Sequence, residues 1–310
     1  MNHSIDIWIV IVTFNAKKWI DECLKSVNES TIKANVIVVD NCSTDGTIAI
    51  LKDKFLQVNT IINQKNEGFG VANNIGISHA LKNGADYIVL LNQDAKLNND
   101  TLEKLYQYAQ QYPKYGILSP MFYSYNGDRL DLYLLRWVFS YNLELASDIF
   151  FKRPKDVYDI NLAPAATWFM RREALIEAGG FDPLFFMYGE DGDLWGRFRA
   201  KGWKAGLFPK TFVYHHTPEN NYTIQKRIWH GYAANINALK NINRSYLQNI
   251  FFLFKDYFKS ILNTILDLNK SELYVIHVSY FKTFTRLKSI YQNRKISHRD
   301  KMPFLSRINT

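Results

Sequence analysis

Three carboxylates, Glu190, Asp191 and Asp193, follow an aromatic stretch, Phe185–Tyr188 (FFMY). A carboxylate that lies partly out of water beside aromatic surface is a suitable general base for a hydroxyl group. Acidic residues also favour the first turn of a helix, where they offset the helix dipole, and this alternative accounts for one or two of the three. It does not account for the aromatic residues before them. We therefore predict that Glu190 and Asp191 are catalytic.

A single carboxylate, Asp40, ends the strand-like run Val36–Val39. Its oxygens can accept hydrogen bonds from a pyrimidine N–H or from ribose hydroxyls. An Asx-type turn that caps the next helix is the alternative explanation for an aspartate at this place.

Asp94 follows another strand-like run, Tyr87–Leu91, with Asn92 two residues before it. A divalent cation held by such a carboxylate can neutralise a departing diphosphate. His215 or His216, at the end of a later predicted strand, can add an imidazole ligand, and mixed oxygen and nitrogen ligation suits Mn²⁺. The alternatives are a solvated turn aspartate and a structural histidine.

Strand-like and helix-like segments alternate over about the first 110 residues. This pattern predicts a parallel sheet covered by helices, which would position the candidate residues. The predicted strands are Ile7–Thr13, Val36–Val39, Asn59–Ile62 and Tyr87–Leu91, with helices near 16–28, 47–55 and 71–83 between them. Ligands of such parallel sheets bind beyond the carboxyl ends of the strands, where Asp40 and Asp94 lie. Gly68-Phe69-Gly70 lacks the third glycine of a dinucleotide fingerprint, and the first βα turn has none, so a Rossmann dehydrogenase is disfavoured.

The second half of the chain gives weaker signals. Residues 113–163 have no clean periodicity. Helices are predicted near 172–179 and 192–201, and short strands at 205–208 and 211–214.

The basic charge of the protein is concentrated after residue 221. The chain carries a net charge of +9, and residues 222–310 hold 15 Lys or Arg against four Asp or Glu. Apolar residues recur there every three or four positions, which predicts amphipathic helices. Such helices either lie on an anionic membrane surface or pack on the catalytic domain or a second subunit. No nucleic-acid-binding motif accompanies the charge, so we expect no nucleic acid partner.

The cellular context is expected to be cytoplasmic. The chain has two cysteines, Cys23 and Cys42, and neither suggests a disulfide framework. There is no signal peptide pattern, and the longest apolar runs have the length of strands. We therefore expect a cytoplasmic protein without a transmembrane helix, peripheral on the inner face of the membrane if the basic segment binds lipid.

Four blocks together resemble family 2 glycosyltransferases, in particular the rhamnosyltransferase-like enzymes of bacterial surface polysaccharide synthesis. They are Ile9–Asn15 (IVIVTFN), Val36–Gly46 (VIVVDNCSTDG), Asn66–Ile77 (NEGFGVANNIGI) with Leu90–Asp94 (LLNQD), and Arg171–His216, which contains RREALIEAGGFDPLFFMYGEDGDL and ends in VYHH. The resemblance covers about residues 1–240. It implies the GT-A fold: an α/β protein with a mostly parallel central sheet flanked by helices, here with a C-terminal helical extension.

The resemblance also implies residue roles. Asp191 looks like the general base, with Glu190 as a supporting neighbour, and Asp94 with His215 looks like the site of Mn²⁺ or Mg²⁺. The donor and nucleotide contacts it implies are Thr13, Asn15, Asp40, Asn66, Gly68, Asn74, Asn92 and Asp94. A weaker acceptor or sugar pocket comprises Trp168, Tyr188 and Asp193.

Two departures from the family pattern affect this site. Asn92 stands where the metal motif usually has its first acid, so metal binding depends on Asp94, His215 and phosphate. Ala165-Ala166-Thr167-Trp168 stands where relatives usually have glycine, which can alter the choice of donor sugar or acceptor.

The expected function is that of an inverting glycosyltransferase. It would move a sugar from a UDP- or dTDP-linked donor, rhamnose being a candidate sugar, to a hydroxyl of a glycan or lipid-linked acceptor. A non-catalytic nucleotide-sugar-binding scaffold is the alternative, and a homo-oligomer is a candidate assembly. Residues 1–221 are expected to form the catalytic domain, with 1–112 binding the nucleotide sugar and 113–221 the acceptor, and residues 222–310 the helical extension.

Overall fold

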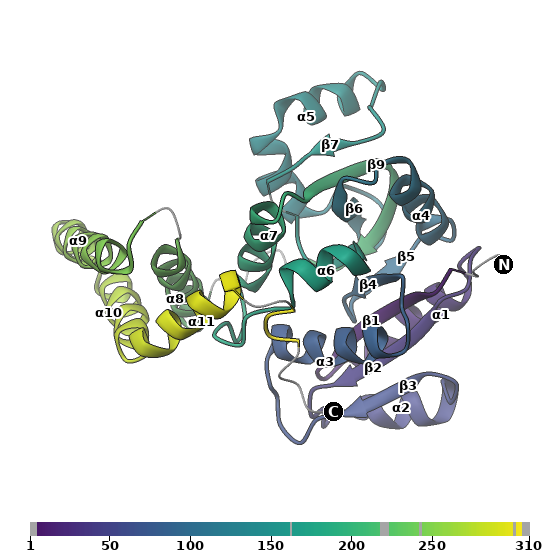
Figure 1. Ribbon diagram of the computed structural model, residues 1–310, viewed down its shortest axis with the longest axis horizontal. Helices are drawn as coiled ribbons and strands as arrows, with labels where there is room; N and C mark the ends of the chain where they lie inside the picture. The colour runs from purple at the N-terminus through teal and green to yellow at the C-terminus, as the bar shows by residue number, and fades with distance from the viewer. Residues whose placement is uncertain (1–4, 162, 218–222, 242–243, 300–301, 306–310) are drawn as a thin grey trace.

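The computed structural model describes residues 5–161, 163–217, 223–241, 244–299 and 302–305. A mixed sheet with the strand order β3-β2-β1-β4-β8-β6-β9-β5 forms its centre, and β7 pairs with β9 (Figure 1). The strands are β1 (Ile7–Thr13), β2 (Asn35–Asp40), β3 (Asn59–Ile62), β4 (Tyr87–Leu91), β5 (Ala95–Leu97), β6 (Tyr115–Ser124), β7 (Tyr158–Asp159), β8 (Thr167–Arg171) and β9 (Lys204–His215).

Strands β3, β2, β1 and β4 are parallel, as their continuous apolar sequences predict. Pairing of Thr13 with Asp40, and of Asp40 with Ile62, brings the carboxyl ends of three strands to one edge. The segment Asn92–Asp94 leaves β4 at the same edge, because β4 pairs in parallel with β1. The predicted gathering of polar residues at this edge is therefore confirmed.

The other half of the sheet alternates in direction. Strand β8 is antiparallel to both β4 and β6, whereas β6 and β9 are parallel. The prediction of two short strands at 205–208 and 211–214 is wrong, because β9 is continuous. Its pairing with β6 shifts register between Phe208 and Phe212, and this irregularity surrounds Pro209, which cannot donate a ladder hydrogen bond.

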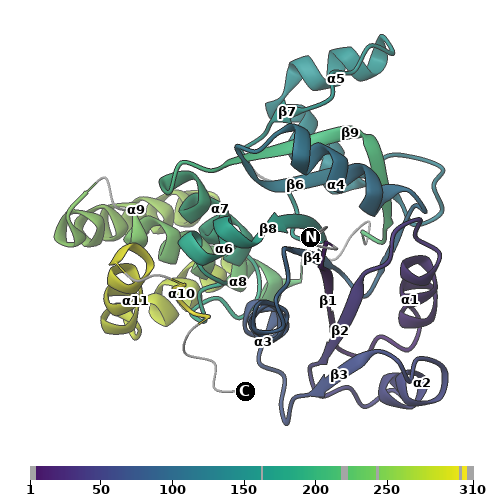
Figure 2. The same cartoon turned by 45° about the vertical axis from the view of Figure 1, so that its right-hand side comes forward.

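Helices cover both faces of the parallel strands. Figure 2 shows α3 on one side of β1 and β2 and α1 and α2 on the other. Helix α3 begins at Phe69, two residues before its predicted start. The helices of this part are α1 (Ile20–Asn28), α2 (Thr47–Lys54), α3 (Phe69–Lys82), α4 (Thr101–Gln111), the π-helical η1 (Leu134–Phe139), α5 (Leu143–Phe150), α6 (Arg172–Ala178) and α7 (Glu190–Ala200).

The C-terminal segment forms a separate helical body, α8–α11, with its own apolar cluster. The helices are α8 (Ile224–Lys240), α9 (Tyr246–Leu266), α10 (Lys270–Phe284) and α11 (Leu287–Arg299). The apolar residues that recur at helical spacing from Leu273 to Tyr291 are divided between α10 and α11. Within the described ranges, none of the helices combines the length and the hydropathy that crossing a membrane requires.

Contacts across the predicted domain boundary are extensive, although the boundary at residues 221 and 222 itself lies outside the described residues. Leu184 and Phe185 belong to the apolar cluster of the helical body. In the other direction, Met302 donates a backbone hydrogen bond to Ile176, and Gly180 donates one to Pro303. The division of the chain into 1–221 and 222–310 stays a prediction.

Candidate active site

A pocket of about 210 Å³ opens at the carboxyl ends of β1, β2 and β4. We call it the strand-end pocket. Its lining includes Asn66 and Asn92 from the predicted donor set, and Met187 from the aromatic stretch. The full lining is Val12, Phe14, Asn41, Asn66, Phe69, Asn92, Gln93, Asp94 and Met187. Loops that are distant in the sequence therefore meet at one concave site.

Asp40 and Thr13 tie the ends of β1 and β2 together. The Thr13 hydroxyl donates to Asp40 over 2.8 Å, and the backbone N–H and hydroxyl of Ser43 donate to the same carboxylate over 2.8 and 2.6 Å. Both Thr13 and Asp40 are fully buried. The carboxylate thus makes the turn bond that the structural alternative predicted, and a contact of Asp40 with a nucleotide stays a prediction.

Asn15 shapes the loop after β1. Its φ of 51° lies in the left-handed region, which asparagine tolerates better than most residues. Its side-chain oxygen accepts the N–H of Thr44 over 2.9 Å, and its own N–H donates to Ser43. Asn15 therefore joins the loops that follow β1 and β2.

Asn41 organises the pocket floor, and sequence reasoning passed over it. Its amide donates to the Asn66 side chain over 2.9 Å and to the carbonyl of Gly68 over 3.2 Å. Its oxygen accepts from Asn63 and from the N–H of Glu67, both over 3.0 Å. The only signal in the sequence was its place next to Asp40 at a strand end.

Gly68 allows the nucleotide-side loop to touch the aromatic stretch. It has a φ of 84°, and a Cβ built on it would lie 2.4 Å from the carbonyl oxygen of Phe186. The next residue, Phe69, donates its N–H to that oxygen over 3.1 Å. A side chain at position 68 would both strain the backbone and push these loops apart.

Asn74 connects α3 to the backbone of Phe181, which precedes the aromatic stretch, and it does not line the strand-end pocket. It is fully buried, its amide nitrogen donates to the carbonyl of Phe181, and its oxygen accepts the N–H of Phe181, each over 2.7 Å. Both polar atoms are therefore used within the protein. Asn74 thereby positions the loop that leads to the acidic pair, and its contact with a nucleoside stays a prediction.

His215 faces Asp94, as predicted, and a further acid orients it. The Nε2 atom of His215 lies 3.8 Å from Asp94, and its Nδ1 lies 3.3 Å from the buried Asp131. Burial alone would raise the pKa of Asp131, but the hydrogen bond and charge of His215 and the hydroxyl of Thr217 hold that pKa below its usual range. Asp131 lies in the segment without periodicity, so no sequence signal identified it.

The donor set of Asp94 and His215 fits a divalent cation in part. Ligand distances of about 2.0–2.2 Å place two ligands of one cation about 3–4 Å apart, which the 3.8 Å separation satisfies. Across the described part of the chain, no group of three or more His, Cys, Asp or Glu side chains forms a complete cage. A cation would therefore need phosphate and water as further ligands, and Asn92 lies beside Asp94 in the pocket lining.

A larger pocket of about 490 Å³ lies on the other side of His215. The aromatic ring of Trp19 stacks on His216 at 4.6 Å within it, and the Lys18 ammonium lies over Trp19. Lys18 and Arg129 also line this pocket. Because Asp94 lines one pocket and His215 the other, the pair marks the boundary between them.

The acidic pair begins α7 after an unusual turn. Tyr188 and Gly189 have φ values of 69° and 86°, so two consecutive left-handed residues precede Glu190. Such backbone strain in a non-glycine residue persists only where the surroundings impose it. Tyr188 stacks on His230 of α8 at 4.2 Å, and Gly189 packs against Ala233. Helix α8 thus supports the turn that presents the pair.

Glu190 and Asp191 lie in a poorly solvated environment. Burial, and then the charge of Asp191, raise the pKa of Glu190 to about 8, and burial raises the pKa of Asp191 as well. One Glu190 oxygen has no hydrogen-bond partner among the described residues. Asp191 accepts the N–H of Gly192 over 2.8 Å and is only half-buried, so it remains the more accessible of the two. Neither residue lines the strand-end pocket, but Met187 does, three residues before Glu190.

Two of the weaker acceptor-pocket predictions are not supported by the structure. Trp168 is fully buried in β8, between Phe181 and Trp195. Asp193 is paired with Lys240 and Arg197, and both partners lie within the protein. Trp168 is therefore a core residue and Asp193 a structural anion. Tyr188 is half-buried and lies beside the acidic pair, and its place in an acceptor pocket stays a prediction.

Replacing Glu190 with glutamine is expected to stabilise the protein, and more so at high pH. The folded protein holds a proton on Glu190 up to about pH 8, whereas the unfolded chain releases it near the ordinary value of 4.5. Stability therefore falls between these values as pH rises, and glutamine abolishes that loss. Because a tenfold difference in proton affinity is worth about 1.4 kcal/mol, we expect a gain above about 1 kcal/mol at pH 8.

Denaturant unfolding of the wild type and of Glu190→Gln at pH 5 and pH 8 measures this effect. The exposed Glu173 occurs in the first turn of α6, and Glu173→Gln is the matched control. A gain from Glu190→Gln that does not grow between the two pH values would show that Glu190 is already ionised in the folded protein.

Comparisons with known proteins agree with this geometry. The model of glycosyl transferase family 2 matches residues 8–179, more than half of the chain. The N-acetylglucosaminyl-diphospho-decaprenol L-rhamnosyltransferase of Mycobacterium tuberculosis is 25% identical over 237 residues, which cover 67% of this chain and 75% of that protein. The dTDP-rhamnosyl transferase RfbF of Shigella flexneri is 36% identical over 104 residues, which cover 32% of this chain and 33% of RfbF.

Solved structures show the same fold at low identity. Staphylococcus aureus TarS 1-349 in complex with UDP-GlcNAc matches with a TM-score of 0.56 and 15% identity, over 94% of this chain and 92% of that one. The mannosyltransferase PcManGT from Pyrobaculum calidifontis, in complex with GDP-Man and Mn²⁺, matches with a TM-score of 0.56 and 17% identity, over 94% and 88%. The chain therefore belongs to glycosyl transferase family 2, and it is a glycosyltransferase with the GT-A fold.

Proposed function

We propose that the protein transfers a sugar, with inversion, from a UDP- or dTDP-linked donor to a hydroxyl of a glycan or lipid-linked acceptor in surface polysaccharide synthesis. Rhamnose is the favoured sugar, because two relatives carry rhamnosyl transfer in their names and one of these also names a decaprenol-linked substrate. The observation that carries the proposal is the strand-end pocket, with Asp94 facing His215 on one side and Met187 leading to the acidic pair on the other.

The donor would occupy the strand-end pocket. Asn66, held in place by Asn41, offers its amide nitrogen to the nucleoside, and Phe14 and Phe69 offer apolar surface. Asp94 and His215 lie where the diphosphate must be neutralised, and Asp131 keeps the His215 ring turned toward Asp94. A bound divalent cation would add Lewis-acid stabilisation of the departing diphosphate.

The acceptor would be activated by Asp191. Its carboxylate takes the proton of the acceptor hydroxyl as the acceptor oxygen forms its bond to the anomeric carbon. The bond between that carbon and the diphosphate oxygen breaks, and its electron pair leaves with the nucleotide diphosphate. The raised pKa of Asp191 suits this role, because a base whose pKa approaches the working pH accepts a proton more readily. Glu190, protonated in its buried place, limits the negative charge beside the base.

Donor screening and product stereochemistry test this proposal. Thermal shift with UDP- and dTDP-linked sugars, each with Mn²⁺, Mg²⁺ or EDTA, should identify a donor that stabilises the protein only with metal. NMR of the product formed from that donor should show an inverted anomeric configuration. Retention would contradict the single-displacement mechanism, and full activity in EDTA would contradict the cation. Stabilisation by purine-linked sugars alone would contradict the proposed donor class.

A further inference from the structure

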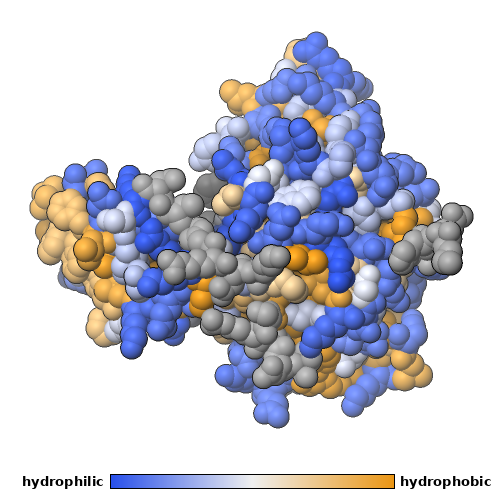
Figure 3. All heavy atoms as spheres, in the orientation of Figure 1, coloured by the Kyte–Doolittle hydropathy of each residue, from blue (hydrophilic) through white to orange (hydrophobic). Residues whose placement is uncertain are grey.

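Helix α9 exposes a continuous apolar stripe along its outer side. Phe251, Phe258 and Leu262 are 66%, 65% and 59% exposed. With 100° between successive residues, six of the exposed apolar positions lie within about 80° of one another over about 27 Å of helix. We call them the α9 stripe: Leu247, Phe251, Phe254, Phe258, Leu262 and Ile265. Figure 3 shows apolar surface gathered at this end of the molecule, over α9 and α10.

The inner side of α9 already packs on the helical body, through the buried Leu253 and the partly buried Tyr246, Ile250 and Tyr257. Asn249 and Thr264 are buried there beside Leu253. Asn249 holds the helix in place by donating to the carbonyls of Leu239 and Asn241 over 3.0 and 2.7 Å, at the end of α8. A helix that needed only to pack on its own protein would have a polar outer side. The second, exposed apolar side of α9 therefore indicates that the stripe meets an apolar environment outside the chain.

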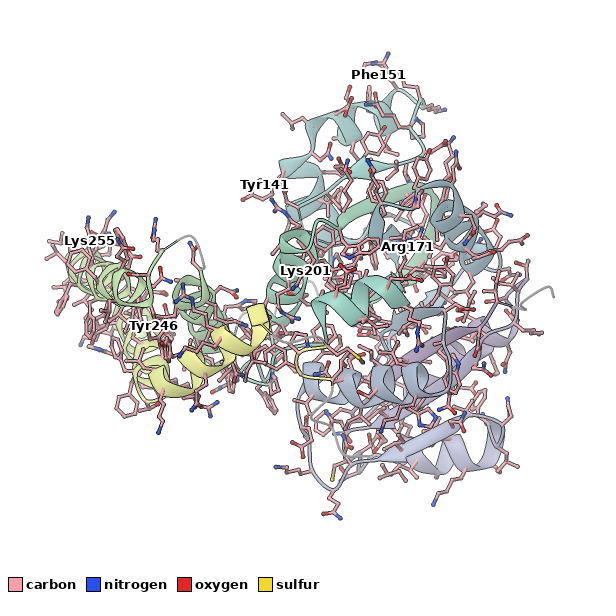
Figure 4. The ribbon with its side chains drawn as sticks, viewed as in Figure 1. Tyr141, Phe151, Arg171, Lys201, Tyr246 and Lys255 are labelled. Atoms are coloured by element: carbon pink, nitrogen blue, oxygen red, sulfur yellow. The ribbon has the colours of Figure 1, made fainter. Side chains whose placement is uncertain are left out.

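Basic side chains border the stripe on one side. Lys255 follows Phe251 by one helical turn, and Lys259 comes directly after Phe258; both are exposed. The acid of this helix, Asp256, lies about 160° from the centre of the stripe. Lys255 lies at the end of the molecule that is distant from the catalytic sheet (Figure 4). Apolar residues flanked by lysines are typical of helices that lie in the interface of an anionic bilayer, where lysine stems reach along the apolar surface to the headgroups.

We propose that the α9 stripe binds an anionic membrane surface, with the helix lying in the plane of the bilayer. A second copy of this chain is the less suitable occupant, because pairing two α9 stripes would bring the lysines of two strongly basic segments together. Helix α9 lies apart from the sheet whose strand ends form the strand-end pocket, so membrane binding through α9 would not cover that pocket (Figure 1). The proposal stands whatever donor sugar the enzyme uses.

Flotation of the full-length chain with vesicles tests the proposal. We expect binding to vesicles of phosphatidylglycerol and phosphatidylcholine, and much weaker binding to phosphatidylcholine alone. The triple variant Phe251→Gln, Phe258→Gln, Leu262→Gln should lower the partition coefficient by at least about tenfold, because it removes the apolar side chains available for insertion. The double variant Lys255→Gln, Lys259→Gln should lower binding to anionic vesicles and weaken its salt dependence.

The control variants change exposed residues of the same types elsewhere. Leu56→Gln with Ile62→Gln, and Lys52→Gln with Lys201→Gln, should leave flotation unchanged. Circular dichroism and nucleotide binding verify that the α9 variants are folded. Failure of the wild type to float, or flotation of the triple variant at the level of the wild type, would overturn the proposal. A wild-type dimer in light scattering that the triple variant no longer forms would also overturn the proposal, because a second copy of the chain would then cover the stripe.

Discussion

Replacing Asp191 with asparagine is expected to lower kcat by about 10²–10⁴-fold, the usual contribution of a positioned general base. Asparagine keeps the side-chain oxygen that accepts the N–H of Gly192, so the start of α7 should be preserved. It cannot take the acceptor proton. Because Asp191 does not line the strand-end pocket, the affinity for the donor nucleotide should stay within about twofold of the wild type, a change below about 0.4 kcal/mol.

Initial rates and nucleotide titration calorimetry on the same preparations separate these two effects. Glu173→Gln is the matched control, since Glu173 is the second residue of α6 as Asp191 is of α7. The wild-type rate should also rise with pH through the raised pKa of Asp191, because only the ionised carboxylate is a base. Near-normal turnover of Asp191→Asn, or an unchanged pH profile, would assign the base to another residue.

The parallel half of the fold could be predicted because its signals are local. A run such as Ile7–Thr13, apolar at nearly every position, specifies a strand buried on both faces, and the predicted bounds of β1, β3 and β4 agree with the structure. Parallel strands then bring their carboxyl ends to one edge by geometry alone. Asn66, Asn92 and Asp94 all follow such strands in the sequence, and all three line the strand-end pocket.

The partners of the site residues could not be predicted in the same way. Asn74 bonds to Phe181, which is 107 residues away, and His215 pairs with Asp131, which is 84 residues away. A single sequence gives the type of a side chain but not the group it will meet. Asn74, Asp193 and a nucleotide-binding amide or acid look alike in a motif, and only the packed structure shows which have their polar atoms already satisfied.

The contacts of the C-terminal helices with the catalytic half could not be predicted from the sequence either. Composition predicted a basic, amphipathic extension, and α8–α11 are helical as expected. It did not predict that α8 would support the strained turn at Tyr188, or that a charge in α8 would reach α7. A chain ending near residue 240 would also lose Asn293, which donates to Asp182, and the backbone hydrogen bonds that join Met302 and Pro303 to Ile176 and Gly180. Point variants in α9 leave these contacts in place.

Replacing Lys240 with methionine is expected to lower the free energy of unfolding by about 3–5 kcal/mol, the usual penalty for removing one partner of a buried ion pair. Lys240 donates to Asp182 over 2.5 Å and also to Asp193, and all three side chains are almost fully buried. Arg197 pairs with Asp193 over 3.0 Å, and Asn293 of α11 donates to Asp182 over 2.6 Å. Methionine matches the length of lysine but leaves Asp182 without a cation.

The depressed pKa of Asp193 gives this prediction its pH dependence. Burial alone would raise that pKa, but the charges of Lys240 and Arg197 hold it below its usual range. The ion pairs of Asp193 therefore stabilise the folded protein above pH 3.8, the ordinary pKa of an aspartate. This stabilisation is lost as the pH falls through the lower pKa that Asp193 has in the folded state. The penalty of Lys240→Met should accordingly be largest near neutral pH and smaller in acid, where the uncovered carboxylates can be protonated.

Urea unfolding at pH 7 and pH 4 measures both effects, with Lys25→Met as the matched control. Lys25 pairs with Asp21 over 2.6 Å on the exposed side of α1, so the same substitution there should change stability far less. Adding Asp182→Asn to Lys240→Met should recover part of the loss, since the uncompensated charge is then removed.

Equal losses of stability from Lys240→Met and Lys25→Met would mean that water reaches Lys240 and its two aspartates. The ion pair of Lys240 with Asp193 would then not join α8 to α7. A large loss at Lys240 alone would instead make the basic extension a structural part of the catalytic centre, because the helix it anchors begins with Glu190 and Asp191.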